Sequence, residues 1–98
     1  MREKEIEKKL VEETKRRKGL ALKFVSPGFD GMPDRILLLP GGKIAFVEVK
    51  APGRQPRPLQ LVRHATLRRL GFQVFVLDDE LMIKKILEEV MPHEVHTP

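Results

Sequence analysis

The sequence predicts a single α/β domain, an α+β arrangement around one small mixed sheet, and three observations support this. Apolar residues recur at helical spacing in some segments and in short continuous runs in others, and proline or glycine separates most segments. The 98 residues allow one domain, spanning 1–98, and no second one. The expected elements are a helix over 2–18, strands over 20–25, 34–39 and 43–50, a helix over 58–70, a strand over 72–77 and a helix from 78 or 79 to 90 or 91.

The N-terminal segment is predicted to be an amphipathic helix. Ile6, Leu10 and Val11 lie at helical spacing among charged residues, and the basic residues of the last turns complement the helix dipole. Gly19 then ends the helix, since glycine readily adopts the backbone conformation that follows a helix C-terminus. The next apolar run is short enough for a strand, and the two prolines and two glycines of residues 26–33 predict a loop.

Residues 34–39 and 43–50 are predicted to form a β-hairpin around Pro40-Gly41-Gly42. Apolar residues occupy both odd and even positions of the two strands, which point to opposite faces of a sheet. Both faces of the pair are therefore expected to be covered, and the pair is expected to be central in the sheet. The segment over 51–58 contains three prolines, a glycine and two arginines, and it is therefore expected to be a basic loop.

The second long helix is expected to begin at Pro58, where proline fits the first turn, and to stop at Gly71. Its inward stripe is predicted to comprise Leu59, Val62, Ala65, Thr66 and Arg69, with His64 facing solvent. The last helix is capped by Asp78 or Asp79. Its predicted inward residues are Leu81, Met82, Ile86, Leu87 and Val90. Residues 92–98 are expected to be a frayed tail.

Composition excludes several classes of function. The chain has no cysteine, which excludes disulfides, thiolate zinc sites and cysteine nucleophiles. Its apolar runs are too short to span a bilayer and its charged N-terminus is no signal peptide, so a cytoplasmic protein without a membrane partner is expected. Nineteen Lys and Arg against fourteen Asp and Glu give a net charge of +5 and a pI near 9.8, which favours a polyanionic partner such as nucleic acid.

Three charged residues of the predicted hairpin form a candidate site. Glu48 and Lys50 are alternate residues, so they point to one face of an otherwise apolar strand, and Asp34 begins the neighbouring strand. Buried charges are costly unless they are paired or bind a metal. Two carboxylates suit Mg²⁺ or Mn²⁺, and the lysine could orient an attacking water and stabilise charge on a phosphate. The alternative is an internal ion pair between Lys50 and one of the carboxylates.

The length of the hairpin turn decides whether the two carboxylates can share a cation. Asp34 and Glu48 lie on one face only if the strands pair around a three-residue loop, or if a bulge corrects the register. A two-residue Gly41-Gly42 turn would pair Asp34 with Val49 and send Glu48 to the other face. The metal hypothesis therefore requires the three-residue turn Pro40-Gly41-Gly42 or a bulge.

The same residues resemble the VRR-NUC domain of the PD-(D/E)xK nuclease superfamily. The resemblance consists of Gly31-Met32-Pro33-Asp34, then Phe46-Val47-Glu48-Val49-Lys50-Ala51-Pro52-Gly53, then Gln60, and it covers almost the whole chain. It implies a restriction-endonuclease-like αβββαβ core, here with a C-terminal helix. It also implies a compact, phage-type, metal-dependent DNA endonuclease that cuts branched DNA such as Holliday junctions, in a bacterial or phage-infected cell. Two coordinated cuts need two sites, so a homodimer is expected.

The resemblance also implies roles for individual residues. Asp34 and Glu48 would bind Mg²⁺ or Mn²⁺ together with the carbonyl of Val49, and Lys50 would be the catalytic lysine. Gln60 would support the water on the metal or the phosphate. The family places a further glutamate on the first helix, where Glu3 is preferred because its spacing from Ile6 and Leu10 puts it on the inward face. Glu7 is the reserve, and Glu5 is expected to face solvent.

Basic residues surround the predicted site. Lys23 and Arg35 border it, and Arg54, Arg57 and Arg63 lie in the loop after the motif and on the following helix. They are expected to contact phosphates without reading sequence. Solubilising charge is the alternative for the arginines of the loop and the helix. Two other functions stay open, a non-catalytic nucleic-acid-binding module on the same fold and an RNA-directed nuclease.

Overall fold

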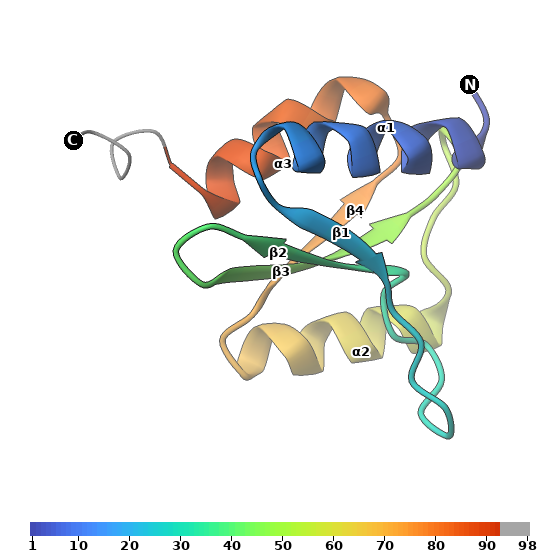
Figure 1. Cartoon of the computed structure of the whole chain (residues 1–98). Helices are drawn as coiled ribbons and strands as arrows, with labels where there is room; N and C mark the ends of the chain where they lie inside the picture. The colour runs from blue at the N-terminus through green and yellow to red at the C-terminus, as the bar shows by residue number, and fades with distance from the viewer. Residues whose placement is uncertain (93–98) are drawn as a thin grey trace.

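The computed structural model describes residues 1–92 and shows a four-stranded sheet between helices (Figure 1). The predicted tail lies outside the described residues from 93 onward. The elements, in chain order, are α1 (Glu3–Arg16), β1 (Leu20–Lys23), β2 (Arg35–Leu39), β3 (Lys43–Val49), α2 (Pro58–Arg69), β4 (Gln73–Leu77), the 3-10 helix η1 (Glu80–Met82) and α3 (Ile83–Val90). This order confirms the predicted fold class. No helix of the described part is long and apolar enough to cross a membrane.

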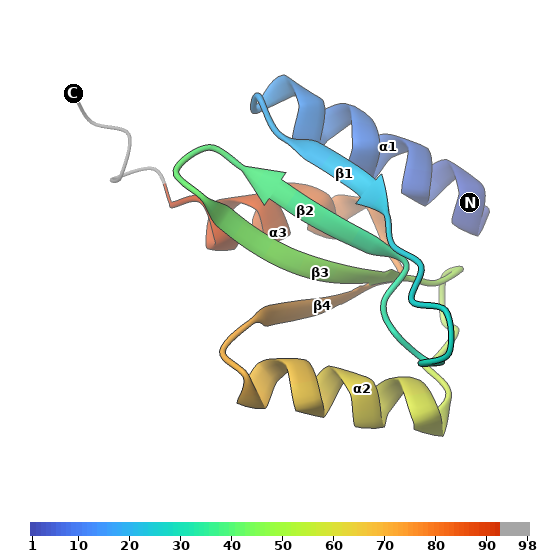
Figure 2. The ribbon, with the colours of Figure 1, turned by 60° about the horizontal axis from the view of Figure 1, so that its bottom comes forward.

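The sheet is mixed and follows the order β1-β2-β3-β4. The strands β1, β2 and β3 are antiparallel neighbours, whereas β4 runs parallel to β3 after the chain has crossed over through α2. Helices α1 and α3 cover one face of the sheet and α2 covers the other, as two views of the ribbon agree (Figures 1 and 2). Strand β3 is thus interior in the sheet and sandwiched between helices.

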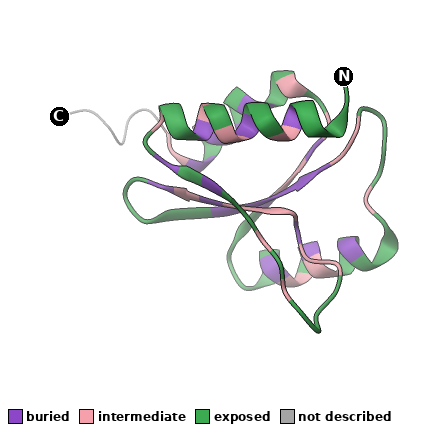
Figure 3. Ribbon diagram, turned by 45° about the vertical axis from the view of Figure 1, so that its right-hand side comes forward, coloured by how far each residue is buried: buried purple, intermediate pink, exposed green. Residues whose placement is uncertain are grey.

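Each face of the sheet has its own core. The larger one joins α1 and α3 to the sheet through residues such as Ile6, Leu37 and Leu87. The smaller one, under α2, is built on Phe46, Leu67 and Val74. All five residues from 45 to 49 of β3 are buried, which confirms the predicted central position of this strand and explains why both of its parities are apolar (Figure 3).

The β2–β3 turn has the length that the metal hypothesis requires. Leu39 pairs with Lys43 and Arg35 with Val47, which leaves Pro40, Gly41 and Gly42 as a three-residue turn. Both glycines have positive φ angles, 85° and 72°, a conformation that side chains disfavour. One step beyond the paired residues, this register sets Asp34 opposite Glu48, on the face that α2 covers.

The predicted inward stripe of α2 is wrong. The buried residues of this helix are Gln60, His64 and Leu67. By contrast, Leu59 is 45% exposed and Val62 is 54% exposed, and His64, expected at the surface, is fully buried. The reason is tertiary: α2 turns its polar residues toward Glu48 of the sheet, so the face that packs is not the most apolar one.

The last helical segment also differs in detail from the prediction. A 3-10 turn precedes α3, and Asp79 caps it by accepting a hydrogen bond from the Leu81 N–H, 3.0 Å. Because this turn has a different pitch, Leu81 is 82% exposed and Met82 is 39% exposed rather than inward. Ile86, Leu87 and Val90 are buried as predicted, together with Ile83.

Candidate active site

The ends of β2 and β3 hold the two predicted carboxylates together. Asp34 directly precedes β2, and its Oδ2 accepts a hydrogen bond from the Val49 N–H across the hairpin, 2.9 Å. Glu48 lies opposite Asp34 in the hairpin register, projects from β3 and is 1% exposed. The Val49 contact fixes the Asp34 carboxylate beside Glu48 and leaves Oδ1 of Asp34 outside that hydrogen bond.

Glu48 receives further contacts from Gln60 and Lys50. The Gln60 side-chain amide donates to Oε2 of Glu48 at 2.9 Å, and the Lys50 Nζ lies 3.4 Å from the same oxygen. The carbonyl oxygen of the Gln60 side chain accepts from the Arg57 N–H at the start of α2, 2.8 Å. Since that backbone donor occupies the amide oxygen, the amide NH₂ must face Glu48. The structure therefore brings Asp34, Glu48, Lys50 and Gln60 together.

The electrostatic environment of Glu48 favours a cation. Burial, followed by the charge of Asp34 and a hydrogen bond with it, raises the pKa of Glu48 to about 7, although Lys50 opposes the shift. Oε1 of Glu48 is buried and has no hydrogen-bond partner within the described residues. Two hard carboxylates, one with an unpaired oxygen, fit a divalent cation. No group of three or more acidic or histidine side chains within residues 1–92 is arranged to hold one, so the carboxylate pair is the candidate.

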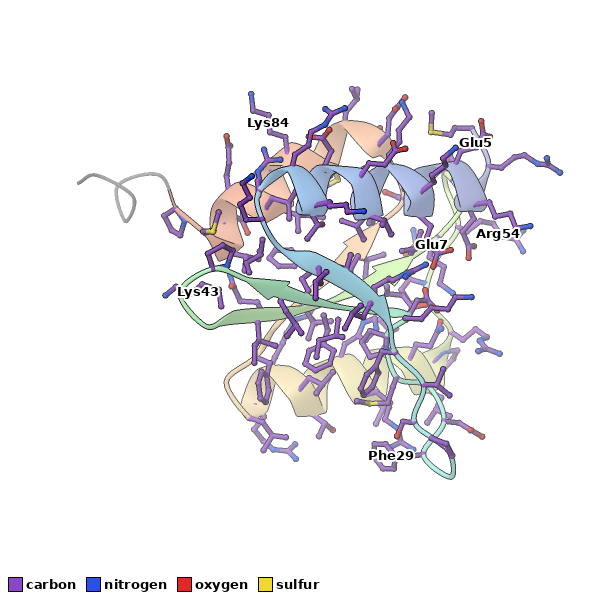
Figure 4. The ribbon with its side chains drawn as sticks, viewed as in Figure 1. Glu5, Glu7, Phe29, Lys43, Arg54 and Lys84 are labelled. Atoms are coloured by element: carbon purple, nitrogen blue, oxygen red, sulfur yellow. The ribbon has the colours of Figure 1, made fainter. Side chains whose placement is uncertain are left out.

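Helix α1 contributes glutamates to a neighbouring cavity of about 280 Å³, which Glu3, Glu7 and Asp34 line together with Lys23, Phe24 and Val25. Glu7 is half-buried and accepts from the Arg35 Nε at 2.8 Å, whereas Glu3 is exposed. The prediction that Glu3 occupies the inward face is therefore wrong, because the packed helix turns Glu7 closer to the sheet. Glu5 is exposed, as predicted, and accepts from the Arg2 N–H at 2.8 Å (Figure 4).

The five predicted DNA-contacting residues fall into two groups. Lys23 is exposed beside the cavity, and Arg54 and Arg57 are exposed after β3 and at the start of α2. Arg35 and Arg63 instead make internal contacts. Arg35 also donates to the Ala21 carbonyl, 3.1 Å, in addition to its bond with Glu7. Two nitrogens of its guanidinium are thus engaged within the protein.

Arg63 organises the β1–β2 loop, which carries Phe29 alongside α2 (Figure 4). Its Nε donates to the Asp30 carbonyl, 2.7 Å, and its guanidinium lies 3.7 Å from the centre of the Phe29 ring. Gly31 lets this loop approach α2: its φ is 89°, and a Cβ there would lie 2.9 Å from the Leu59 side chain. The glycine of the Gly31-to-Asp34 motif thus has a packing role, next to the carboxylate that follows it.

His64, which was expected to face solvent, is a further neighbour of Glu48. This residue is fully buried, and its Nε2 lies 3.5 Å from Oε1 of Glu48. Burial, with smaller effects of Arg68 and Lys50, lowers the pKa of the His64 imidazole. The available signal was its position four residues after Gln60, which places the two side chains on one face of a helix. The outward apolar residues of α2 obscured that signal.

The fold and the clustered carboxylates, lysine and glutamine define a nuclease of the PD-(D/E)xK type. No family model matches the chain. The chain is 58% identical over 80 residues to "Putative nuclease p44" of Acyrthosiphon pisum secondary endosymbiont phage 1, over 82% of this chain and 86% of that protein. A solved structure described as "VRR_NUC domain" matches with a TM-score of 0.83 and 36% identity, over 88% of this chain and 94% of the other. The chain belongs to the VRR-NUC family.

Proposed function

We propose that this nuclease is a divalent-metal-dependent DNA endonuclease that hydrolyses phosphodiester bonds in branched DNA, such as Holliday junctions. The observation that carries the proposal is the buried Glu48 carboxylate, set beside Asp34 and within 3.4 Å of Lys50. A buried carboxylate beside a second carboxylate is a costly arrangement that a bound cation would stabilise. We place its action in the cytoplasm of a bacterial or phage-infected cell.

In this proposal Asp34, Glu48 and the carbonyl of Val49 would hold Mg²⁺ or Mn²⁺. A glutamate of α1 would join them through a water molecule or after a shift of its side chain, since no three such side chains within residues 1–92 are arranged to hold a cation. Glu3 and Glu7 both line the cavity beside Asp34, which supports this role for α1. A cation held there would supply Lewis-acid chemistry, because it would polarise a phosphoryl oxygen and make water a better nucleophile. Gln60 holds Oε2 of Glu48, so the carboxylate keeps one orientation.

Lys50 is the catalytic cation of the protein itself. Its side chain is 17% exposed, so it is largely shielded from water but keeps some contact with solvent. A positioned ammonium can orient the attacking water by a hydrogen bond and stabilise the negative charge that develops on the phosphate. Lys23, Arg54 and Arg57, all exposed, would hold the DNA backbone without reading its sequence.

A four-way junction carrying a fluorescent label tests this function. The junction and a linear duplex of equal sequence are incubated with the full chain in EDTA, Mg²⁺ or Mn²⁺. We expect cleavage of the junction only with a cation, and slower cleavage of the duplex. Equal cleavage in EDTA would contradict metal dependence, and equal cleavage of both DNAs would contradict the junction preference. An RNA junction of the same sequence serves as the third substrate, and preferential cleavage of that RNA would contradict the DNA assignment.

A further inference from the structure

The His64 ring and Oε1 of Glu48 lie next to each other beside the site, and both are buried without a hydrogen-bond partner within the described residues. His64 lies on α2, is 0% exposed, and neither of its ring nitrogens has a hydrogen-bond partner within the described residues. Its Nε2 is 3.5 Å from Oε1 of Glu48, the buried oxygen that also lacks a partner. Buried polar groups are nearly always hydrogen-bonded, so two such exceptions in contact need a common explanation.

We propose that His64 is a positioning residue, which donates its Nε2–H to Oε1 of Glu48 and thereby holds this carboxylate toward Asp34 when the site binds its cation. The proposal rests on the function proposed above and adds a residue to it. An N–H···O hydrogen bond spans about 2.7–3.2 Å, so the 3.5 Å gap closes with a small side-chain rotation.

Helix α2 would then hold both oxygens of Glu48. Gln60 donates to Oε2 at 2.9 Å, and His64, one turn later on the same helix face, is placed to donate to Oε1. With one donor on each oxygen, the carboxylate cannot rotate away from Asp34. Oε1 keeps a second lone pair that is available to a cation, whereas Oε2 also faces the Lys50 Nζ at 3.4 Å.

Packing alone does not explain a histidine at this position. Leu67, the next inward residue of α2, belongs to the apolar core with Phe46 and Val74. A leucine at position 64 would fill similar space without burying two ring nitrogens. An imidazole can carry its hydrogen on either ring nitrogen, and the tautomer with hydrogen on Nε2 fits the contact with Oε1 of Glu48.

Two substitutions separate positioning from packing. His64→Leu keeps an inward side chain but removes the donor, whereas His64→Gln keeps an N–H donor at a similar reach. Leu67→Met, in the same helix face, is the matched control. The readouts are Mn²⁺ affinity, measured by electron paramagnetic resonance on the full chain, and single-turnover cleavage of the junction at saturating Mn²⁺.

We expect His64→Leu to bind Mn²⁺ about 10–100-fold more weakly and to cleave more slowly, as is usual when a partner of a metal ligand is lost. His64→Gln should recover most of both, and Leu67→Met should resemble the wild type. The proposal is overturned if His64→Leu binds and cleaves like the wild type, or if Leu and Gln at position 64 are equally impaired.

A third readout does not depend on nuclease activity. Long-range ¹H–¹⁵N NMR of the metal-free chain reports the tautomer of each histidine, and the His64→Gln spectrum assigns the signal of His64. We expect the Nε2–H tautomer, and the Nδ1–H tautomer would overturn the proposal even if the wild type neither bound Mn²⁺ nor cut DNA. Conversely, an inactive wild type with the Nε2–H tautomer would contradict the proposed function and leave the hydrogen bond supported.

Discussion

At the scale of single residues, the buried position of Glu48 has opposite effects on folding stability and on metal affinity. Its carboxylate is 1% exposed, and burial and Asp34 raise its pKa to about 7. In the metal-free protein this charge opposes folding, since neither Gln60 nor Lys50 fully offsets the loss of water. The same unfavourable environment is what would make a bound cation favourable, so stability and metal affinity conflict at this position.

We expect Glu48→Gln to stabilise the metal-free protein. Because the raised pKa means that the folded state binds the proton more tightly than the unfolded chain, the wild type loses stability as pH rises from about 4.5 to about 7. The neutral variant escapes this loss, so its gain in free energy of unfolding should increase with pH and reach on the order of 2–3 kcal/mol at pH 8. Urea unfolding in EDTA at pH 5 and pH 8 measures the difference, and a gain that is larger at pH 5 would contradict the explanation.

Cleavage should respond in the opposite direction. Glu48→Gln removes a ligand charge and Lys50→Ala removes the ammonium, so each should lower the single-turnover rate on the junction by about 100-fold or more. Binding of the junction, measured by fluorescence anisotropy, should persist in both variants. Lys84→Ala, on the exposed face of α3, removes a lysine remote from the site and should leave the rate unchanged (Figure 4). Near-wild-type turnover of either site variant would show that the site is wrongly assigned.

At the scale of elements, α1 distinguishes its three glutamates by what each contacts. Glu3 lines the cavity beside Asp34, Glu7 lines it and pairs with Arg35, and Glu5 caps the helix start. We expect Glu3→Gln to weaken Mn²⁺ binding and cleavage at unchanged stability, and Glu7→Gln to lower thermal stability as well, because Arg35 loses its partner. Glu5→Gln should change neither metal binding nor cleavage. Mn²⁺ titration with thermal unfolding checks all three, and equal, small effects would make α1 a scaffold only.

The elements also show where sequence reasoning succeeded. The place of the hairpin, around Pro40-Gly41-Gly42, followed from local information. The sequence left the turn length open, and the three-residue turn was expected only because the metal hypothesis requires it. The order of helices and strands followed from the separating prolines and glycines. These features are predictable because neighbouring residues alone determine them.

The faces of the helices were less predictable, because tertiary contacts decide them. Leu59 and Val62 are apolar yet exposed, so the hydrophobic pattern of α2 indicated the wrong face. The helix instead faces inward with Gln60 and His64, whose partner Glu48 is distant in sequence. The same limit applied to α1, where the choice between Glu3 and Glu7 depends on how the packed helix is rotated.

At the scale of the whole molecule, the prediction concerns the oligomeric state. A chain of 98 residues offers one candidate site, and symmetric resolution of a four-way junction needs two. We expect a homodimer at micromolar concentration, with a mass near twice 11.3 kDa by light scattering. Sedimentation velocity over a dilution series is the companion measurement. A strictly monomeric protein that still cut junctions symmetrically would contradict this expectation.

The three-residue turn at Pro40–Gly42 has a consequence for how such a chain can vary. It lies at the end of the hairpin away from Asp34 and Glu48, where insertions are ordinarily tolerated. Yet losing or gaining one residue there would change the pairing by one step and send the two carboxylates to opposite faces. A change of two residues would preserve their alignment. Viable lengths of this turn should therefore be odd unless a bulge compensates, so an exposed segment without chemistry of its own constrains insertions and deletions as tightly as the site does.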